Sequence, residues 1–161
     1  MITISSSSRR SLKSLQCEEA NSYILSMSTA PVISPLLMLE DAGMTVTRAS
    51  DGKEVVNLFK NHPRDTYDLI LMDIMMPNMD GHQATKAIRA LGIERLDAVR
   101  IPIIALSANA FIDDIQESLD SGMNDHISKP INMEELTDTI AKYIKRDTCL
   151  AKELKQKQND R

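Results

Sequence analysis

Three polar residues follow strand-like segments in the second half of this sequence, and their chemical types complement one another. Asp73 directly follows four consecutive apolar residues, 69–72, while Ser107 and Lys129 end two later segments. A carboxylate can attack phosphorus as a nucleophile, an ammonium neutralises anionic oxygens, and a hydroxyl donates a hydrogen bond to one of them. If the three residues meet at one edge of a sheet, they form a set suited to accepting and holding a phosphoryl group.

Each of these residues also has an ordinary structural explanation when it is taken alone. A carboxylate at a strand end can cap the following loop, a serine there often caps a helix, and most lysines are simply solvated. Their joint position at successive strand ends favours a shared function. The pair Lys129-Pro130 supports this interpretation, because a cis peptide bond is accessible before proline and would turn Lys129 inward.

The chain from residue 44 onward alternates strand-like and helix-like segments with short turns, which is typical of βα units around a parallel sheet. Strands are predicted at residues 45–49, 67–73, 101–106 and 125–128, and helices at 53–61, 82–91, 112–121 and 132–146. Helix-end signals support these limits: Gly122 is typical of the position after a helix, and Asn132 with Glu135 has the spacing of a capping box.

Length and composition favour one domain with tails. In the 161 residues we predict a disordered, serine-rich tail at 1–15, a domain over 16–146 and a charged tail at 147–161. Within the domain, the part from residue 44 is regular, whereas 16–43 is atypical. A net charge of −4 without dense Lys/Arg stretches argues against a nucleic-acid-binding surface.

The sequence favours a cytoplasmic protein. No apolar run approaches the roughly 20 residues of a membrane span, and no apolar segment follows Arg9 and Arg10 as in a secretory signal. The two cysteines, Cys17 and Cys149, lie far apart and outside any metal-ligand spacing. A reduced, cytoplasmic setting is the simplest interpretation.

Residues 44–146 resemble the receiver domain of two-component response regulators, and most of all the receivers appended to hybrid histidine kinases. The resemblance rests on Asp73 within LMDIMMPNMDG (71–81), on ALSANA (105–110), on GMND (122–125) and on KPI (129–131). It implies a flavodoxin-like, doubly wound α/β fold, in which a five-stranded parallel sheet of order 2-1-3-4-5 carries five helices on its two faces.

The resemblance also implies roles for particular residues. Asp73 would accept a phosphoryl group from a phosphohistidine of a histidine kinase or histidine phosphotransfer protein, and Ser107 and Lys129 would bind that group. Asp73 and the backbone carbonyl of Met75 would help to hold Mg²⁺. Family members often carry an aromatic switch residue at the position of His126; a solvent-facing strand residue is the alternative interpretation.

The region before residue 44 departs from the family pattern, which has two adjacent Mg²⁺-binding acids after the first strand. In an alignment without gaps, Ser22–Leu25 form the first strand, and Ser26 and Met27 stand where the acids belong. Pro35 then falls within the first helix. Proline is tolerated only near a helix start, so this alignment predicts that the helix begins late, with Ser34 as its cap.

A second alignment fits the local sequence better, and the sequence alone does not decide between the two. Glu19–Met27 would form the first helix, Ser28–Leu37 would be an insertion of ten residues, and the first strand would be truncated or replaced. Neither alignment restores two carboxylates. Glu18 and Glu19 are the nearby candidates as metal ligands, and the requirement for Mg²⁺ is in doubt.

Two functions follow from these observations. The first is a phosphoacceptor receiver module in a two-component phosphorelay, and the second is a degenerate receiver-like module that docks a partner without being phosphorylated. The sequence lacks a glycine-rich phosphate loop, a Gly-x-Ser-x-Gly motif and a kinase ATP-binding region. No stand-alone enzyme is therefore expected, and the only chemistry predicted is autocatalytic transfer to Asp73. The chain would be a separate receiver or part of a hybrid kinase.

Overall fold

A computed structural model describes residues 22–27, 33–41, 43–108 and 112–144 of the chain. The predicted tails at 1–15 and 147–161 lie outside these residues, as do the candidate metal ligands Glu18 and Glu19. Within the described part, no helix combines the length and the apolar composition needed to cross a membrane.

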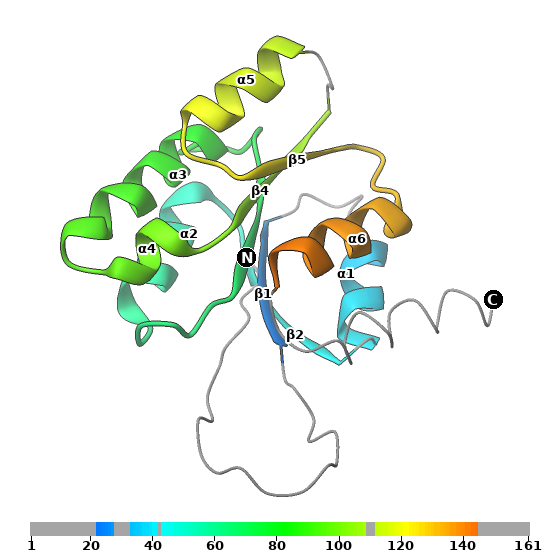
Figure 1. The fold of residues 1–161 in the computed structure, drawn as a ribbon, viewed down its shortest axis with the longest axis horizontal. Coiled ribbons are helices and arrows are strands. Elements are labelled where there is room, and N and C mark those ends of the chain that lie inside the picture. Colours follow the sequence, from blue (N-terminus) through cyan, green and yellow to red (C-terminus); the bar gives the residue numbers. More distant parts are fainter. Residues whose placement is uncertain (1–21, 28–32, 42, 109–111, 145–161) are drawn as a thin grey trace, which may run out of the picture.

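Five parallel strands form one sheet in the order β2-β1-β3-β4-β5, the order predicted from the sequence (Figure 1). The strands are β1 (Ser22–Met27), β2 (Met44–Ala49), β3 (Leu69–Asp73), β4 (Ile103–Ser107) and β5 (Asp125–Ser128). In the register of β3 and β4, Ile70 lies opposite Ile103 and Asp73 opposite Leu106. The predicted doubly wound α/β fold is therefore confirmed.

The burial of strands β3 and β4 accounts for the two apolar runs in the sequence. Every residue of β3 and β4 is buried, including Asp73 and Ser107 at their ends. Parallel strands covered by helices on both faces are apolar at consecutive positions rather than at alternate ones. Side chains such as Phe59 and Ile88 from the surrounding helices complete this core.

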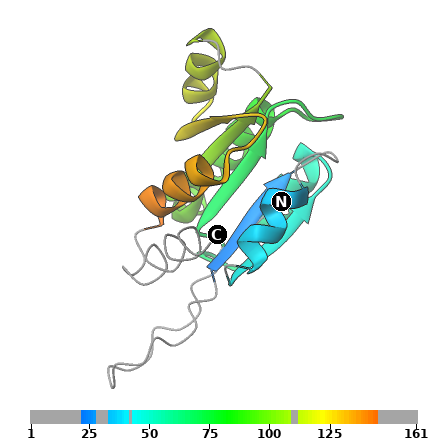
Figure 2. The same ribbon diagram turned by 90° about the vertical axis from the view of Figure 1, so that its right-hand side faces the viewer.

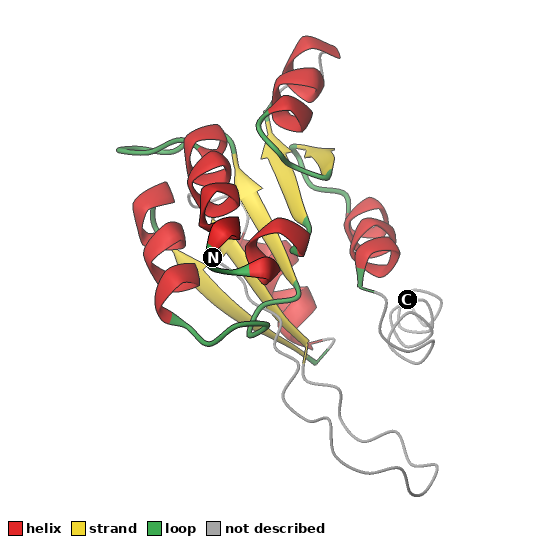
Figure 3. Ribbon diagram, turned by 60° about the vertical axis from the view of Figure 1, so that its left-hand side comes forward, coloured by secondary structure: helices red, strands yellow, loops and turns green. Residues whose placement is uncertain are grey.

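Helices cover both faces of the sheet. Their bounds are α1 (Ile33–Asp41), α2 (Gly52–Asn61), α3 (Gly81–Ala90), α4 (Leu96–Arg100), α5 (Ile112–Asp120) and α6 (Met133–Tyr143), with a 3₁₀ turn, η2, at Leu91–Ile93. Helices α1 and α6 lie in front of the sheet in Figure 2, whereas Figure 3 brings the face with α2, α3 and α4 forward. The expectation of five helices is wrong, because the described residues contain six; η2 and the short α4 were not predicted.

The N-terminal region follows the alignment without gaps. Ser22–Met27 form β1, which pairs with β2 on one side and β3 on the other. The alternative, with a helix over Glu19–Met27 and an insertion at Ser28–Leu37, is wrong. A strand between β2 and β3 supplies hydrogen-bond partners to the backbones of both neighbours, which a helix cannot do.

Two predicted helix limits need correction. Helix α1 begins at Ile33, so Ser34 and Pro35 are inside its first turn, and Ser34 is not the cap. Proline fits there because the first four N–H groups of a helix have no carbonyl partner within it. The last helix ends at Tyr143 rather than at residue 146. Asn132 is the N-cap, as predicted, but its side chain accepts a hydrogen bond from the backbone N–H of Glu134 and not from that of Glu135, the capping-box partner that the sequence suggested.

A buried arginine fastens the loops at the amino-terminal end of the sheet. The Arg95 guanidinium donates to four carbonyl oxygens between Phe59 and Pro63 at the end of α2, at 2.5 to 3.2 Å. It also forms a two-pronged ion pair with Asp97, with nitrogen–oxygen distances of 3.1 and 2.6 Å. Burial favours a raised pKa for Asp97, but hydrogen bonds from Arg95 and from the Asp65 N–H, with the charge of Arg95, lower that pKa overall.

A second arginine joins α3 to the segments before β4 and β5. Arg89 donates to the carbonyl oxygens of Gly122, Ala98 and Ile101 and to the side-chain oxygen of Asn124, at 2.7 to 2.9 Å. Burial lowers the pKa of Arg89 to about 10, so the guanidinium stays charged at neutral pH. The two arginines thus hold together the segments that precede β3, β4 and β5.

Candidate functional site

Asp73 lies at the carboxyl end of β3, where its carboxylate is almost fully buried, with 2% of the residue exposed. One oxygen, Oδ1, accepts a hydrogen bond from the backbone N–H of Met75 at 3.1 Å. The other, Oδ2, forms an ion pair with the Nζ of Lys129. The Lys129 side chain is 22% exposed, so its ammonium reaches the carboxylate from the rim of the site.

The loop after Asp73 folds back over the strand end. The N–H of Gly81 donates to the carbonyl of Ile74 at 3.0 Å, and a Cβ at position 81 would come within 2.5 Å of the Asp73 carbonyl oxygen. Only glycine permits this approach. Asn78 adopts a left-handed conformation in the loop (φ 64°), and the Asp80 side chain caps α3 through the N–H of Gln83. The sequence after Asp73 therefore holds the carboxylate at the base of a short, tight loop.

Ser107 and Lys129 are neighbours at the ends of β4 and β5. The backbone N–H of Lys129 donates to the Ser107 carbonyl at 2.7 Å, which extends the pairing of the two strands. The Lys129–Pro130 peptide bond is cis. The structure thus brings the predicted residues Asp73, Ser107 and Lys129 to one edge of the sheet.

His126 contacts Ser107. It is partly buried, and its Nε2 lies 2.5 Å from the Oγ of Ser107, so the two side chains are hydrogen-bonded. His126 is therefore not simply a solvent-facing strand residue. The reason is the pairing of β4 with β5, which sets Ala105 opposite His126 and leaves the imidazole within reach of the strand end.

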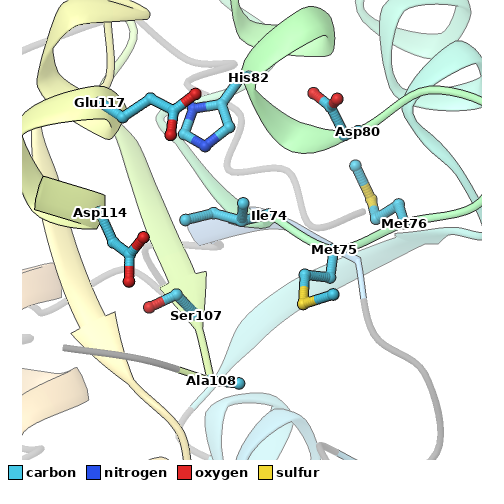
Figure 4. Close-up of a pocket in the computed structure, with 9 residues that line it drawn as sticks. All are labelled: Ile74, Met75, Met76, Asp80, His82, Ser107, Ala108, Asp114 and Glu117. Carbon is cyan, nitrogen blue, oxygen red and sulfur yellow. The ribbon is translucent and has the colours of Figure 1, made fainter. Parts of the chain in front are cut away.

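A pocket of about 560 Å³ opens beside these groups (Figure 4). Its lining consists of Ile74, Met75, Met76, Asp80, His82, Ser107, Ala108, Asp114 and Glu117. The sequence analysis singled out only Ser107 and Met75 among them. Ligands of open α/β sheets bind beyond the carboxyl ends of the strands, and this rule could have pointed to His82 on the first turn of α3.

The described residues do not make a complete Mg²⁺ site. They offer the Asp73 carboxylate, already paired with Lys129, and the backbone carbonyl of Met75, and no three His, Cys, Asp or Glu residues among them are grouped to hold a metal. At the carboxyl end of β1 stand Ser26 and Met27, so this strand brings no carboxylate. Mg²⁺ needs about six oxygen ligands in octahedral geometry, and these donors do not supply the charge that holds it.

The fold and the groups around Asp73 agree with the comparison to known proteins. The sequence matches the family of response regulator receiver domains over residues 33–141, and the chain belongs to this family. The match begins after β1, at the start of α1. The region that the family pattern leaves unmatched is thus the one in which the acidic pair is missing.

Several relatives with curated descriptions are sensor histidine kinases. The chain is 41% identical over 106 residues to sensor protein GacS of Pseudomonas syringae pv. syringae, covering 66% of this chain and 11% of that protein. It is 36% identical over 126 residues to sensor histidine kinase RcsC of Escherichia coli K12, covering 76% and 12%. The chain therefore spans about a tenth of the length of these relatives.

Solved receiver domains share the fold. The receiver domain of sensor histidine kinase PA1611 from Pseudomonas aeruginosa, with a magnesium ion coordinated in its active site cleft, is 37% identical with a TM-score of 0.64, covering 76% of this chain and 97% of that chain. The receiver domain of Saccharomyces cerevisiae Ssk1, solved with the histidine phosphotransfer protein Ypd1, is 27% identical with a TM-score of 0.63, covering 74% and 86%.

Proposed function

We propose that this chain is a phosphoacceptor module of a two-component phosphorelay and that Asp73 receives the phosphoryl group. The observation that carries the proposal is the meeting of Asp73, Lys129 and Ser107 at the ends of three adjacent strands. A carboxylate next to an ammonium and a hydroxyl matches the needs of phosphoryl transfer, which is catalysed mainly by positioning and charge.

In the proposed reaction, an oxygen of Asp73 forms a bond to the phosphorus of a phosphohistidine. The phosphorus–nitrogen bond breaks, and its electron pair returns to the donor imidazole. The Lys129 ammonium neutralises charge on the transferred oxygens, since it already contacts Asp73 Oδ2 and needs to move only a short way. The N–H of Met75, which donates to Oδ1, orients the attacking carboxylate.

Ser107 and His126 form the proposed switch. In the described state the Ser107 hydroxyl is hydrogen-bonded to His126 Nε2. A phosphoryl oxygen on Asp73 would accept a hydrogen bond from the same hydroxyl, so the contact with His126 would weaken or reorganise. His126 lies within β5, two residues before the strand ends at Ser128, and a shift there would alter the surface of β5 and α6.

The proposed partner is a histidine kinase or a histidine phosphotransfer protein. The sensor histidine kinases among the relatives support the first, and the complex of Ypd1 with the Ssk1 receiver supports the second. Such a partner must bring its phosphohistidine to the loop edge at Asp73. Met75, which is 73% exposed beside Asp73, offers an apolar contact at this point.

The proposal is tested by intact-mass spectrometry after incubation with acetyl phosphate and Mg²⁺. The expected result is a gain of one phosphoryl group, and its complete loss in Asp73→Asn. Asp80→Asn is the matched control, because it removes a carboxylate from the same loop while asparagine still caps α3. Equal labelling of Asp73→Asn and the unmodified chain would refute Asp73 as the acceptor.

A second candidate function is a receiver-like module that binds a partner without being phosphorylated. The observation in its favour is the pair Ser26 and Met27 at the end of β1. The same experiment separates the two functions, since this module would take up no phosphoryl group under conditions that label an ordinary receiver.

A further inference from the structure

The charges in direct contact at Asp73 balance without a metal ion. Asp73 contributes one buried carboxylate, and the Lys129 ammonium pairs with it directly. The family pattern has three carboxylates, which one ammonium and one divalent cation together balance. In this chain the loss of two carboxylates and the loss of a divalent cation would cancel, leaving the same net charge at the site.

The register of the sheet locates the missing charges. Parallel pairing sets Ser26 of β1 opposite Leu71 of β3, two residues before Asp73. The backbone positions of Ser26 and Met27 therefore stand beside the last residues of β3, at the edge where a ligand of an ion bound to Asp73 would have to originate. A hydroxyl and a thioether are poor substitutes there, because Mg²⁺ prefers charged, hard oxygen ligands.

The acidic residues of the neighbouring pocket do not replace them. Asp80 uses its carboxylate to cap α3, and Asp114 and Glu117 belong to α5, the helix that follows β4. Neither Asp73 nor Lys129 lines that pocket. Within the described ranges these carboxylates and Asp73 are not gathered closely enough to share one ion.

We infer that this receiver is charge-balanced by Lys129 alone and that its site around Asp73 does not bind Mg²⁺ at millimolar concentration. For the unphosphorylated protein the inference stands on the sheet register and the ion pair. For the phosphorylated protein it rests on the proposed function. A phosphoryl group carries a charge of about −1.5 to −2 at neutral pH. Transfer adds the same charge to this site as to a site that holds a metal ion, so the net charges of the two sites stay equal.

The first test is direct metal binding to the unphosphorylated chain, with Mn²⁺ as the probe because it accepts the same oxygen ligands as Mg²⁺. Free Mn²⁺ is measured by electron paramagnetic resonance during titration, and Mg²⁺ is added as competitor. The expected result is no saturable binding below about 1 mM, the weak end of oxygen-ligand sites. Saturation at micromolar Mn²⁺ that Asp73→Asn abolishes would overturn the inference.

Restoring the acids sharpens this test. The double variant Ser26→Asp, Met27→Asp should bind Mn²⁺ at least about tenfold more tightly, the lower limit of what supporting groups contribute to a metal site. Thr45→Asp is the matched control, since it adds a carboxylate at an exposed position of β2 near the other end of the sheet. If the double variant folds poorly, the titration of the unmodified chain still decides the question.

Glu18 and Glu19 are tested in the same way. If the unmodified chain binds Mn²⁺ tightly and Glu18→Gln, Glu19→Gln removes the binding, carboxylates before β1 complete the site and the inference is wrong. Unchanged weak binding in the Gln variant agrees with it.

Labelling by acetyl phosphate in EDTA and in Mg²⁺ then separates this inference from the proposed function. Equal labelling at Asp73 in both conditions is the expected result. Labelling that requires Mg²⁺ would refute the inference and keep the function, whereas no labelling in either condition would refute the function.

Discussion

The two ends of the sheet are built in opposite ways. At the amino-terminal end, the guanidinium groups of Arg95 and Arg89 donate several hydrogen bonds each to carbonyl oxygens and side chains of neighbouring loops. At the carboxyl end, Asp73 and Lys129 are joined by an ion pair, and Ser107 is hydrogen-bonded to His126. The amino-terminal end is held by many hydrogen bonds, whereas the groups at the carboxyl end make few and stay within reach of an incoming ligand.

The choice of cation at each end reflects this difference. Arg95 meets Asp97 with two parallel hydrogen bonds, a geometry that only a guanidinium fork can make. Lys129 meets Asp73 as a point charge on a flexible stem. An ammonium can follow charge as it moves from a carboxylate to a phosphoryl group, while a guanidinium fixed by six contacts cannot. The dense side-chain contacts therefore lie at the amino-terminal end of the sheet, away from the candidate site.

Replacing Arg95 should have the largest effect. Arg95→Met leaves the buried Asp97 without its partner and should lower the free energy of unfolding by about 3–5 kcal/mol. Urea denaturation measures this loss. Labelling of Asp73 at a temperature where the variant is folded should persist. Arg95→Lys keeps the positive charge but loses the two-pronged geometry, so its free energy of unfolding should lie between those of Arg95→Met and the unmodified chain. A loss below about 1 kcal/mol for Arg95→Met would show that the amino-terminal contacts add little stability.

Lys129→Met should change the rate of phosphoryl labelling rather than the stability of the fold. Removing the ammonium that contacts Asp73 should slow labelling by acetyl phosphate by about 100-fold, the usual effect of removing one electrostatic contact in a reactive site. The rate of mass gain measures the change. Lys142→Met, which removes an exposed lysine paired with Asp125, is the control and should label normally. An unchanged rate in Lys129→Met would exclude Lys129 from the transfer.

Acid should weaken the amino-terminal end through Asp97. Its pKa is lowered in the folded protein relative to 3.8, so its contribution to stability is present above about pH 3.8 and is lost as the pH falls through the folded pKa. Urea midpoints between about pH 6 and pH 3 should show that Asp97→Asn is the less acid-sensitive protein. Asp138→Asn, at an exposed site on α6, is the control. Parallel curves for Asp97→Asn and the unmodified chain would contradict this assignment.

The smallest effect is expected at a helix cap near the carboxyl edge. Asn132→Ala removes the side-chain acceptor for the N–H of Glu134 and should cost about 1 kcal/mol in urea denaturation. Asn132→Asp keeps an acceptor and should be nearly neutral. A loss as large as that of Arg95→Met would show that the two ends contribute equally to stability.

The positions of the candidate site residues at strand ends were predictable because local signals mark them. Apolar runs locate β3 and β4, turn formers end them, and a polar residue at each end then points to a shared edge. The contact between Ser107 and His126 was not predictable in the same way. The sequence around His126 is that of an ordinary strand. Its contact with Ser107 becomes apparent only when the pairing of β4 and β5 is known.

The amino-terminal clamp lay beyond sequence reasoning for a related reason. Arg95 stands 32 to 36 residues from the carbonyl groups that it binds, and its surroundings carry no periodic pattern. The five residues of α4 are too few to give a helical signal. A short helix of this kind exists because tertiary contacts hold it, not because its own residues favour it.

Local sequence signals were enough to predict the α/β class, the position of Asp73, Ser107 and Lys129 at strand ends, and most helix limits, because these depend on residues close together in the chain. The choice between the two alignments of the N-terminal region required the pairing of the strands in the sheet. A strand at Ser22–Met27 is stabilised by hydrogen bonds to β2 and β3, segments about 22 and 45 residues away in sequence. Local sequence patterns do not reveal such bonds, and the same pairing places Ser26 opposite Leu71, two residues before Asp73.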